Sequence, residues 1–252
     1  MKPFFSVNIV VKKQPHLLAY TLESVIAQKE KEIEINIIVD MVHDVRSVVK
    51  EYQKYLRYVH FVKEKGVSEM MNEIIMQAKG RYLQFLCPGD SYLSHHALGE
   101  MIPFLKENNY PDFAFSPFIC REDVASPIIG IRKFSHEFLK AGKVPSRLAC
   151  CFFSVEILRD MQGFDKRYEY RECFDLFCRL FTQSKCKFLF YPKVLVDYIV
   201  SKKSAKEALR YSFETLLSII RNFGIKEAVF GWIRVNYLLL LKLWLKSLKK
   251  TI

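Results

Sequence analysis

The chain has 252 residues, of which 50% are hydrophobic and 14% aromatic, and its formal net charge is +12. This length suits one large domain, or one domain with an appendage, and this apolar content excludes a wholly disordered chain. The positive charge favours an anionic partner such as a nucleotide, a membrane surface or a nucleic acid. An uneven distribution of lysine on an ordinary globular protein would give the same total.

Cysteine usage and the N-terminus bear on the compartment. Seven cysteines are present without a Cys-x-x-Cys pair, and Cys150 and Cys151 are adjacent. This pattern is typical of a reduced, cytosolic protein rather than a disulfide-stapled one. The apolar run at the N-terminus is too short and too polar for a signal peptide, and no uncharged apolar run reaches the ~20 residues of a membrane span.

The N-terminal part of the chain alternates between apolar strands and amphipathic helices. The pattern predicts strands at 5–11, 34–40, 58–62 and 82–86, with helices at 16–28, 45–56 and 68–79 between them. Such a β-α-β order predicts a parallel sheet with right-handed crossovers. Gly80 follows the third helix and is predicted to be its C-terminal cap.

Two acidic residues follow buried strands of this predicted sheet. Asp40 ends the second strand, and Asp90 ends the loop CPGD that follows the fourth. Open α/β sheets bind ligands beyond the carboxyl ends of their strands, so Asp40 and Asp90 are the first candidates for a site. A loop aspartate that caps the next helix explains the position of Asp40 nearly as well.

The middle of the chain continues the mixture of helices and strands. The pattern predicts a helix from Ser94 to Leu105, a strand at 113–118, a return to the sheet at 147–153, a short helix capped by Ser154, a helix at 171–182 and a last strand at 187–191. His95 and His96 are adjacent and would point in different directions, so they are predicted to be surface residues and not metal ligands. Glu172 and Asp175 fall in the first turn of a helix, where acidic residues also complement the helix dipole.

From Ser204 onward the sequence predicts helices alone. One helix runs to about Asn222 and stops at Gly224, and another runs from Ile225 almost to the C-terminus. One face of the latter carries Val229, Phe230, Ile233, Tyr237, Leu240, Leu241, Trp244 and Leu248, and the other side carries Arg234, Lys242, Lys246, Lys249 and Lys250. A basic amphipathic helix of this kind is typical of a segment that lies in a membrane interface. A helix docked on the rest of the protein would show the same pattern.

Three segments, in order and spacing, resemble the family 2 glycosyltransferases of GT-A fold over residues 4 to about 200. The segments are SVNIVV with EINIIVD, then EKGVSEMMNEI at 64–74 with CPGD at 87–90, and finally MQGFDKRYEYRECFDLFCRL at 161–180. The second is similar to the D-K-G-I-Y-D-A-M-N-K-G-I and N-x-G-D motifs of one branch, and the third to its G-G-F-D and A-A-D-Y-D-L motifs. The resemblance implies an α/β, Rossmann-like GT-A domain at 1–201, with a mostly parallel central sheet flanked by helices, and a helical extension at 202–252.

The resemblance also implies a chemistry. It implies a UDP- or GDP-linked sugar donor, a Mg²⁺ or Mn²⁺ ion and inverting transfer to the hydroxyl of an envelope or lipid-linked glycan, at the cytoplasmic membrane face. Asp90 matches the metal aspartate of the family, Asp40 the nucleoside contact, and Glu69 and Asn72 the lining of the donor site. A divalent cation on a carboxylate would neutralise the departing diphosphate.

Two cysteines depart from the family pattern. Cys87 stands where many relatives have Asp or Asn, and a thiol is a poor ligand for a hard cation. Cys173 stands at the expected catalytic base, with Glu172 beside it and Asp175 at the second aspartate of the motif. The base has therefore moved to Glu172 or Asp175, or it has been lost, and a glycosyltransferase-like binding or scaffold protein is then the alternative. No helix-turn-helix, zinc-finger spacing or RNP-like motif supports a nucleic-acid partner.

Overall fold

The computed structural model describes residues 2–42, 44–121, 128–129, 135–183, 185–199, 204–233 and 237. The chain forms two compact units. The first comprises Met1–Arg132, Ser146–Gly163 and Cys186–Val200, and the second comprises Lys133–Pro145, Phe164–Lys185 and Ser201–Ile252. The predicted domain boundary at residue 201 stays a prediction.

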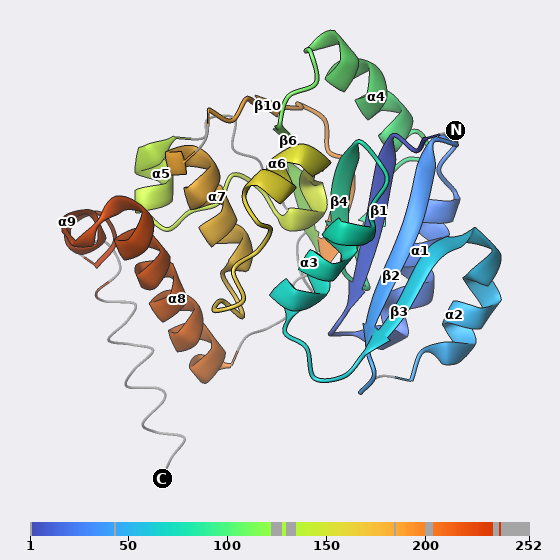
Figure 1. The fold of residues 1–252 in the computed structure, drawn as a ribbon, viewed down its shortest axis with the longest axis horizontal. Helices are drawn as coiled ribbons and strands as arrows, with labels where there is room; N and C mark the ends of the chain where they lie inside the picture. Colours follow the sequence, from blue (N-terminus) through green and yellow to red (C-terminus); the bar gives the residue numbers. More distant parts are fainter. Residues whose placement is uncertain are drawn as a thin grey trace. The chain divides into compact units, whose positions relative to one another are not determined.

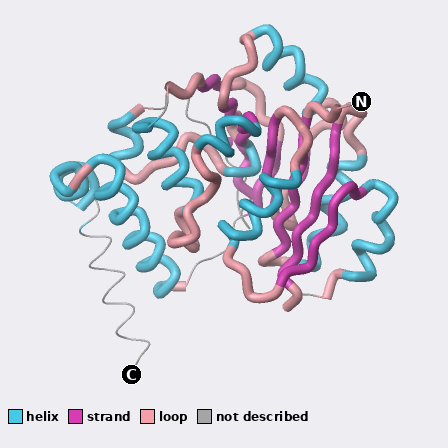
Figure 2. Tube along the Cα trace, viewed as in Figure 1, coloured by secondary structure: helices cyan, strands magenta, loops and turns pink. Residues whose placement is uncertain are grey.

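A seven-stranded sheet forms the centre of the first unit (Figure 2). Its strands, in spatial order, are β10 (Phe188–Phe190), β6 (Phe113–Phe115), β9 (Cys151–Ser154), β4 (Tyr82–Leu86), β1 (Phe5–Val11), β2 (Ile33–Asp40) and β3 (Leu56–Val62). Neighbours are parallel except at β9, which is antiparallel to both β4 and β6. The predicted α/β class with a mostly parallel central sheet is confirmed.

Helices flank the parallel strands on both faces. The helices α1 (Leu18–Ile26) and α2 (Arg46–Tyr52) connect β1 to β2 and β2 to β3, whereas α3 (Val67–Gln77) leads from β3 back across the sheet to β4. In Figure 1, α3 lies in front of these strands and α1 behind them. The strand order therefore reverses between β1 and β4, and such a reversal is where open α/β sheets bind ligands.

Buried polar side chains link the central strands. Asn36 Nδ2 donates to Asn8 Oδ1 at 2.9 Å, and Asn8 Nδ2 donates to Gln84 O at 3.1 Å. All three residues are buried. A slip of one residue would leave these groups unpaired in the interior, so the polar contacts fix the register of β1, β2 and β4.

Gly80 is not a helix cap, contrary to the prediction. The helix α3 ends at Gln77 with Ala78 as its C-cap, and Gly80 is not among the residues with positive φ. Instead, Gly80 N donates to Ser6 Oγ at 2.9 Å, and a Cβ at Gly80 would lie 2.5 Å from Ser6 N. The close approach of this segment to β1 requires glycine.

The helix predicted from Ser94 is shifted. The helix α4 (Ala97–Glu107) has His96 as its N-cap residue, and Ser94 Oγ accepts a hydrogen bond from His96 N at 3.1 Å before the helix begins. His95 and His96 are exposed, as predicted. The helix predicted after Ser154 is confirmed as α6 (Val155–Asp160), because Ser154 Oγ accepts from Ile157 N at 3.1 Å.

A second, smaller sheet was not predicted. It contains, in spatial order, β5 (Ser91–Tyr92), β11 (Val196–Ile199), β7 (Phe118–Arg121) and β8 (Ile128–Ile129). The expectation that the last strand lies at 187–191 is therefore wrong, since β11 follows it. Strands of two to four residues are too short to show a periodicity in the sequence.

The second unit is helical in the part that the structure describes. Its elements are α5 (His136–Lys140), α7 (Glu172–Gln183), α8 (Ala205–Phe223), α9 (Ile225–Glu227) and the π-helical turn η4 (Ala228–Ile233). A capping box of Ser204 and Glu207 begins α8, and Gly224 ends it, as predicted. Beyond Ile233 the predicted amphipathic helix lies outside the described residues, apart from Tyr237. Among the helices described, none has the length and hydrophobicity to cross a membrane.

Candidate active site

Asp40 lies buried at the carboxyl end of β2. Lys12, which directly follows β1, forms an ion pair with Asp40 Oδ2 and donates from Nζ to Lys65 O at 3.0 Å. Asp40 Oδ1 accepts from Val42 N at 3.3 Å. Two neighbouring strands thus bring a lysine and an aspartate together, and sequence reasoning missed Lys12 because lysines commonly follow strands.

The first two turns of α3 carry the next two predicted residues. Glu69 Oε2 accepts from Gly66 N at 3.1 Å and so caps the helix. Asn72 lies about one turn later, and a Cβ at Gly163 would collide with Asn72 Oδ1. Gly163 also has a φ of 68°, so both its backbone conformation and its contact with Asn72 require glycine at this position.

The CPGD turn holds Asp90 from two sides. Asp90 N donates to Cys87 O at 3.0 Å, and Cys87 N donates to Asp90 Oδ2 at 2.7 Å. Gly89 has a φ of 103°, and its N donates to Thr21 Oγ1 on α1 at 2.8 Å. These contacts fix the carboxylate of Asp90 just beyond the carboxyl end of β4.

Asp90 is only 4% exposed, and burial raises the pKa of its carboxyl to about 7. The negative charge of Asp197 adds to this rise in pKa, whereas the Cys87 N–H and the positive charge of Arg147 oppose it. Asp197 lies on β11 directly across from Ser91. A nearby cation would therefore stabilise the ionised form of Asp90.

The structure brings the four donor-side candidates to one edge of the sheet. Asp40 ends β2, the helix that carries Glu69 and Asn72 follows β3, and Asp90 follows β4. This is the edge at which the carboxyl ends of the parallel strands meet.

In the second unit, α7 begins at Glu172, one of the two candidates for the base. Glu172 Oε1 accepts from Cys173 Sγ at 3.7 Å, and Oε2 is buried without a hydrogen-bond partner among the described residues. Burial raises the pKa of Glu172 to about 7, and the negative charge of Glu214 adds to the rise. A carboxylate whose pKa lies near neutral pH is suited to accept a proton.

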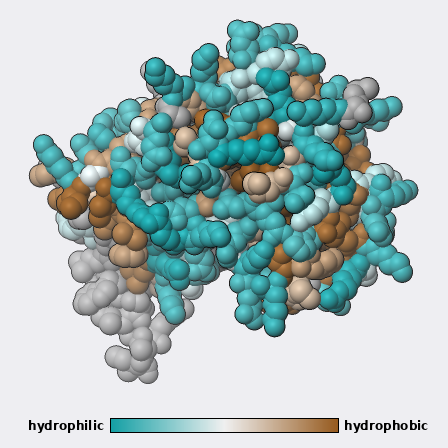
Figure 3. Space-filling model, in the orientation of Figure 1, coloured by the Kyte–Doolittle hydropathy of each residue, from teal (hydrophilic) through white to brown (hydrophobic). Residues whose placement is uncertain are grey.

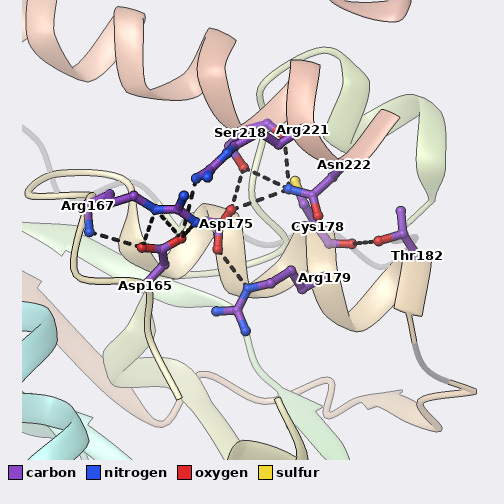
Figure 4. Close-up of polar contacts among 9 residues, drawn as sticks. All are labelled: Asp165, Arg167, Asp175, Cys178, Arg179, Thr182, Ser218, Arg221 and Asn222. Atoms are coloured by element: carbon purple, nitrogen blue, oxygen red, sulfur yellow. Dashed lines mark hydrogen bonds and ion pairs between the residues drawn. The ribbon is translucent and has the colours of Figure 1, made fainter. Parts of the chain in front are cut away.

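Asp175, the other candidate, has both oxygens engaged (Figure 4). Oδ2 accepts from Arg179 Nε at 2.7 Å, and Oδ1 accepts from Ser218 Oγ at 3.2 Å and from Asn222 Nδ2 at 3.3 Å. The carboxylate thus joins α7 to α8. These contacts favour Glu172 over Asp175 as the base, and the catalytic role of each stays a prediction.

Glu214 is a buried residue of α8 that sequence reasoning missed. Its carboxylate accepts from the backbone N of Glu169, Tyr170 and Arg171 at 2.8 to 3.2 Å. Arg210 Nε donates to it at 3.1 Å. The loop before α7 is thereby tied to α8. The available signal was a lone acidic residue in an otherwise uncharged stretch of the helix.

Comparison with known proteins decides the family. The family model described as Glycosyl transferase family 2 matches residues 6–161, more than half of the chain. The chain is a family 2 glycosyltransferase.

Solved structures share the fold of this glycosyltransferase. TarS 1–349 of S. aureus, in complex with UDP, has a TM-score of 0.67 and 15% sequence identity over 90% of this chain and 68% of that one. The mannosyltransferase PcManGT of Pyrobaculum calidifontis, in complex with GDP-Man and Mn²⁺, has a TM-score of 0.64 and 14% identity over 88% of this chain and 64% of that one. Such low identities show the fold alone, and the predicted GT-A fold is confirmed. No curated protein matches the sequence.

The carboxylate of Asp90 fits a divalent cation by the chemistry of its oxygen atoms. Asp90 offers a hard carboxylate oxygen, and the charge of Asp197 acts on it. Within the described ranges, no group of three or more His, Cys, Asp or Glu side chains could hold a metal. Mg²⁺ binds through one or two carboxylates together with waters and substrate phosphates, so these residues fit an ion whose coordination the donor completes.

Proposed function

We propose that this family 2 glycosyltransferase transfers a sugar from a UDP- or GDP-linked donor to an acceptor hydroxyl with inversion at the anomeric carbon. The buried Asp90 carries the proposal, because it places a carboxylate just beyond the carboxyl end of β4, where burial raises its pKa to about 7. Asp40, Glu69 and Asn72 line the donor at the same edge of the sheet. Proteins of similar fold are known with UDP, UDP-GlcNAc, or GDP-Man and Mn²⁺.

Asp90 is the residue that would hold Mg²⁺ or Mn²⁺. A bound ion of this kind supplies Lewis-acid stabilisation of the leaving diphosphate. Cys87 N donates to the carboxylate of Asp90, and Gly89 N donates to Thr21 Oγ1. These two hydrogen bonds keep the carboxylate in place before the donor arrives. A preorganised charge needs no rearrangement when the donor binds.

Glu172 is the base in this proposal. Its buried Oε2 and a pKa of about 7 support the removal of a proton from the acceptor hydroxyl as the new glycosidic bond forms. Cys173, at the base position of the family, donates from its thiol to Glu172 Oε1 at 3.7 Å. Cys173 therefore stabilises the carboxylate beside it rather than replacing it.

Nucleotide binding tests the donor site. Calorimetric titration of UDP and GDP, with and without Mn²⁺, should show metal-dependent binding that Asp90→Asn removes. Asp160→Asn, a change at an exposed aspartate of α6, is the matched control and should bind like the wild type. Failure of the wild type to bind any nucleotide of a panel in a metal-dependent way would contradict the proposal.

A binding protein without catalysis is the second candidate, and Cys173 is the observation that favours it. If the wild type is inert towards nucleotide sugars and Cys173→Asp gains activity, the base has been lost. If an active wild type is inactivated by Glu172→Gln, the base lies at Glu172.

An envelope or lipid-linked glycan is the proposed acceptor, and the enzyme is proposed to act as a peripheral protein on the cytoplasmic membrane face. The sequence from 228 to 252 supports this, because it contains Arg and Lys but no acidic residue. Trp232 is buried and packs on Gly142, so a deletion should begin at 234 to keep this contact. Removal of 234–252 should release the protein from anionic vesicles, and unchanged binding would refute the membrane role.

A further inference from the structure

The helix α8 has a polar buried side and an apolar exposed side. Its buried residues are Ser212, Glu214, Thr215, Ser218 and Ile219. Phe213 is 59% exposed and Leu217 is 36% exposed. Surface helices normally turn their apolar stripe to the core, so α8 has the reverse arrangement.

Hydrogen bonds within the second unit account for the polar side. Glu214 accepts from three consecutive N–H groups before α7, and Ser218 and Asn222 donate to Asp175. Rotation of α8 to bury its apolar side would leave these groups unpaired, which is costly in an interior. The helix therefore keeps its apolar side outward.

Two exposed and two partly buried apolar side chains form a continuous stripe. Leu209, Phe213, Leu217 and Ile220 recur at intervals of three or four residues, which places them on one side of the helix. Phe213 and Leu217 also line a groove of about 420 Å³. Further exposed apolar residues follow in the chain, namely Ile225, Val229 and Phe230. Figure 3 shows hydrophobic atoms gathered over the region of α8 and α9, and we call Leu209, Phe213, Leu217 and Ile220 the outer stripe.

Positive charge accompanies the outer stripe. Lys206 is exposed and lies one turn before Leu209 and two turns before Phe213. Lys226 is exposed just after the end of α8. Neither lysine has an ion pair in the described part of the chain. Arg210 is shared between Glu169 and Glu214, so it adds less. After Glu227 the sequence continues with basic residues and no acidic one.

We propose that the outer stripe of α8 inserts into the interfacial layer of an anionic lipid bilayer. Apolar side chains bordered by cations are what a helix lying in such an interface presents. A second copy of this chain is a poorer partner, because it would bring like charges together in a protein of net charge +12. The inference rests on the proposed membrane association and adds a lipid-contacting site within the folded second unit.

Co-sedimentation of the full-length protein with vesicles tests the outer stripe. The double variant Phe213→Glu/Leu217→Glu should bind phosphatidylglycerol-containing vesicles at least about tenfold more weakly, because two apolar side chains leave the interface. Met76→Glu is the matched control, since Met76 is an apolar residue of α3 that is 70% exposed. This control should bind like the wild type, and vesicles of phosphatidylcholine alone should bind little.

The outcomes separate this inference from the membrane proposal. If removal of 234–252 abolishes binding while Phe213→Glu/Leu217→Glu binds like the wild type, the membrane association stands and the inference is overturned. A wild type that ignores anionic vesicles overturns both. If light scattering shows the wild type to be a dimer and the double variant to be a monomer, the outer stripe binds a second copy of the chain and the inference is overturned.

A direct probe covers the case in which the double variant folds poorly. Phe213→Trp in a chain with Trp244→Phe leaves Trp232 as the other tryptophan, and Trp232 is buried. Brominated lipids should quench the fluorescence of this variant more strongly than that of the chain with Trp244→Phe alone. Equal quenching of the two chains would contradict insertion of the stripe.

Discussion

In each of the two units, one candidate carboxylate is paired with a cation and another has no ion pair in the described part of the chain. In the first unit Asp40 is paired with a lysine, whereas Asp90 has no ion pair within the described ranges. In the second, Asp175 is paired with an arginine, whereas Glu172 has none there. Burial raises the pKa of both Asp90 and Glu172 to about 7. The paired carboxylates hold elements together, while the unpaired ones lower stability when ionised and are kept where the chemistry of the family is expected.

The largest expected effect is on the rate of transfer. Glu172→Gln should lower kcat about 10²- to 10⁴-fold, because the acceptor hydroxyl loses its general base. Donor KM should stay the same, and the wild-type rate should rise with pH through about 7, since the base acts when deprotonated. Steady-state kinetics across pH would measure both, with Glu169→Gln as a control at an exposed position in the preceding loop. A fully active Glu172→Gln would contradict the role of Glu172 as the base and leave its difference from Asp175 without a catalytic meaning.

The paired carboxylate of the same unit should matter for stability. Asp175→Ala removes the ion pair with the largely buried Arg179, and we expect a loss of about 3 kcal/mol in the free energy of unfolding. Urea denaturation would measure it. The double variant Asp175→Ala/Arg179→Ala should lose less free energy of unfolding than the two single variants lose in sum, because the two side chains interact directly. A stable Asp175→Ala would show that the carboxylate does not join α7 to α8.

The unpaired carboxylate should make stability depend on pH. The pKa of Glu172 in the folded protein is raised to about 7, so the folded state binds a proton more tightly than the unfolded state does. This contribution is fully present below the ordinary pKa of a glutamate and is lost as pH rises through about 7. The free energy of unfolding should therefore fall by ~2 kcal/mol more between pH 5 and pH 8 in the wild type than in Glu172→Gln. If urea denaturation shows the same change in the free energy of unfolding with pH in both proteins, Glu172 is not held protonated by the fold.

The smallest expected effect concerns one neutral hydrogen bond to Asp175. Ser218→Ala removes the donor at 3.2 Å, while Arg179 and Asn222 still engage the carboxylate. A loss of about 1 kcal/mol in the free energy of unfolding is expected. Thr215→Val, an adjacent buried hydroxyl that bonds its own helix at 2.8 Å, offers a comparison within α8. A loss as large as that of Asp175→Ala would mean that the bond from Ser218, and not the ion pair with Arg179 within α7, accounts for the stability that Asp175 contributes.

Local sequence pattern was sufficient where strands are buried on both faces. The strands at Phe5–Val11 and Tyr82–Leu86 have the predicted bounds, because continuous apolar runs flanked by polar residues mark them. The short strands of the second sheet have no such run. Gly80 shows a different limit, since its need for glycine comes from Ser6, far away in the chain.

Contacts between distant residues explain what the sequence did not reveal about the site. Asp40 and Asp90 were identified because they follow strands, which is a local signal. The lysine that pairs with Asp40 lies 28 positions away from it in the sequence. The residues of α8 that contact Asp175 lie 43 or more positions away from Asp175. The reversed polarity of α8 likewise makes sense only once Glu214 and its partners are seen together.

The carboxylate of Glu214 also decides which anions the start of α7 can attract. Successive backbone N–H groups ahead of a helix form a concavity that commonly binds phosphate. Here three of them already point at a side chain of the protein itself. The start of α7 thus holds an internal anion in the place that a phosphate would otherwise take.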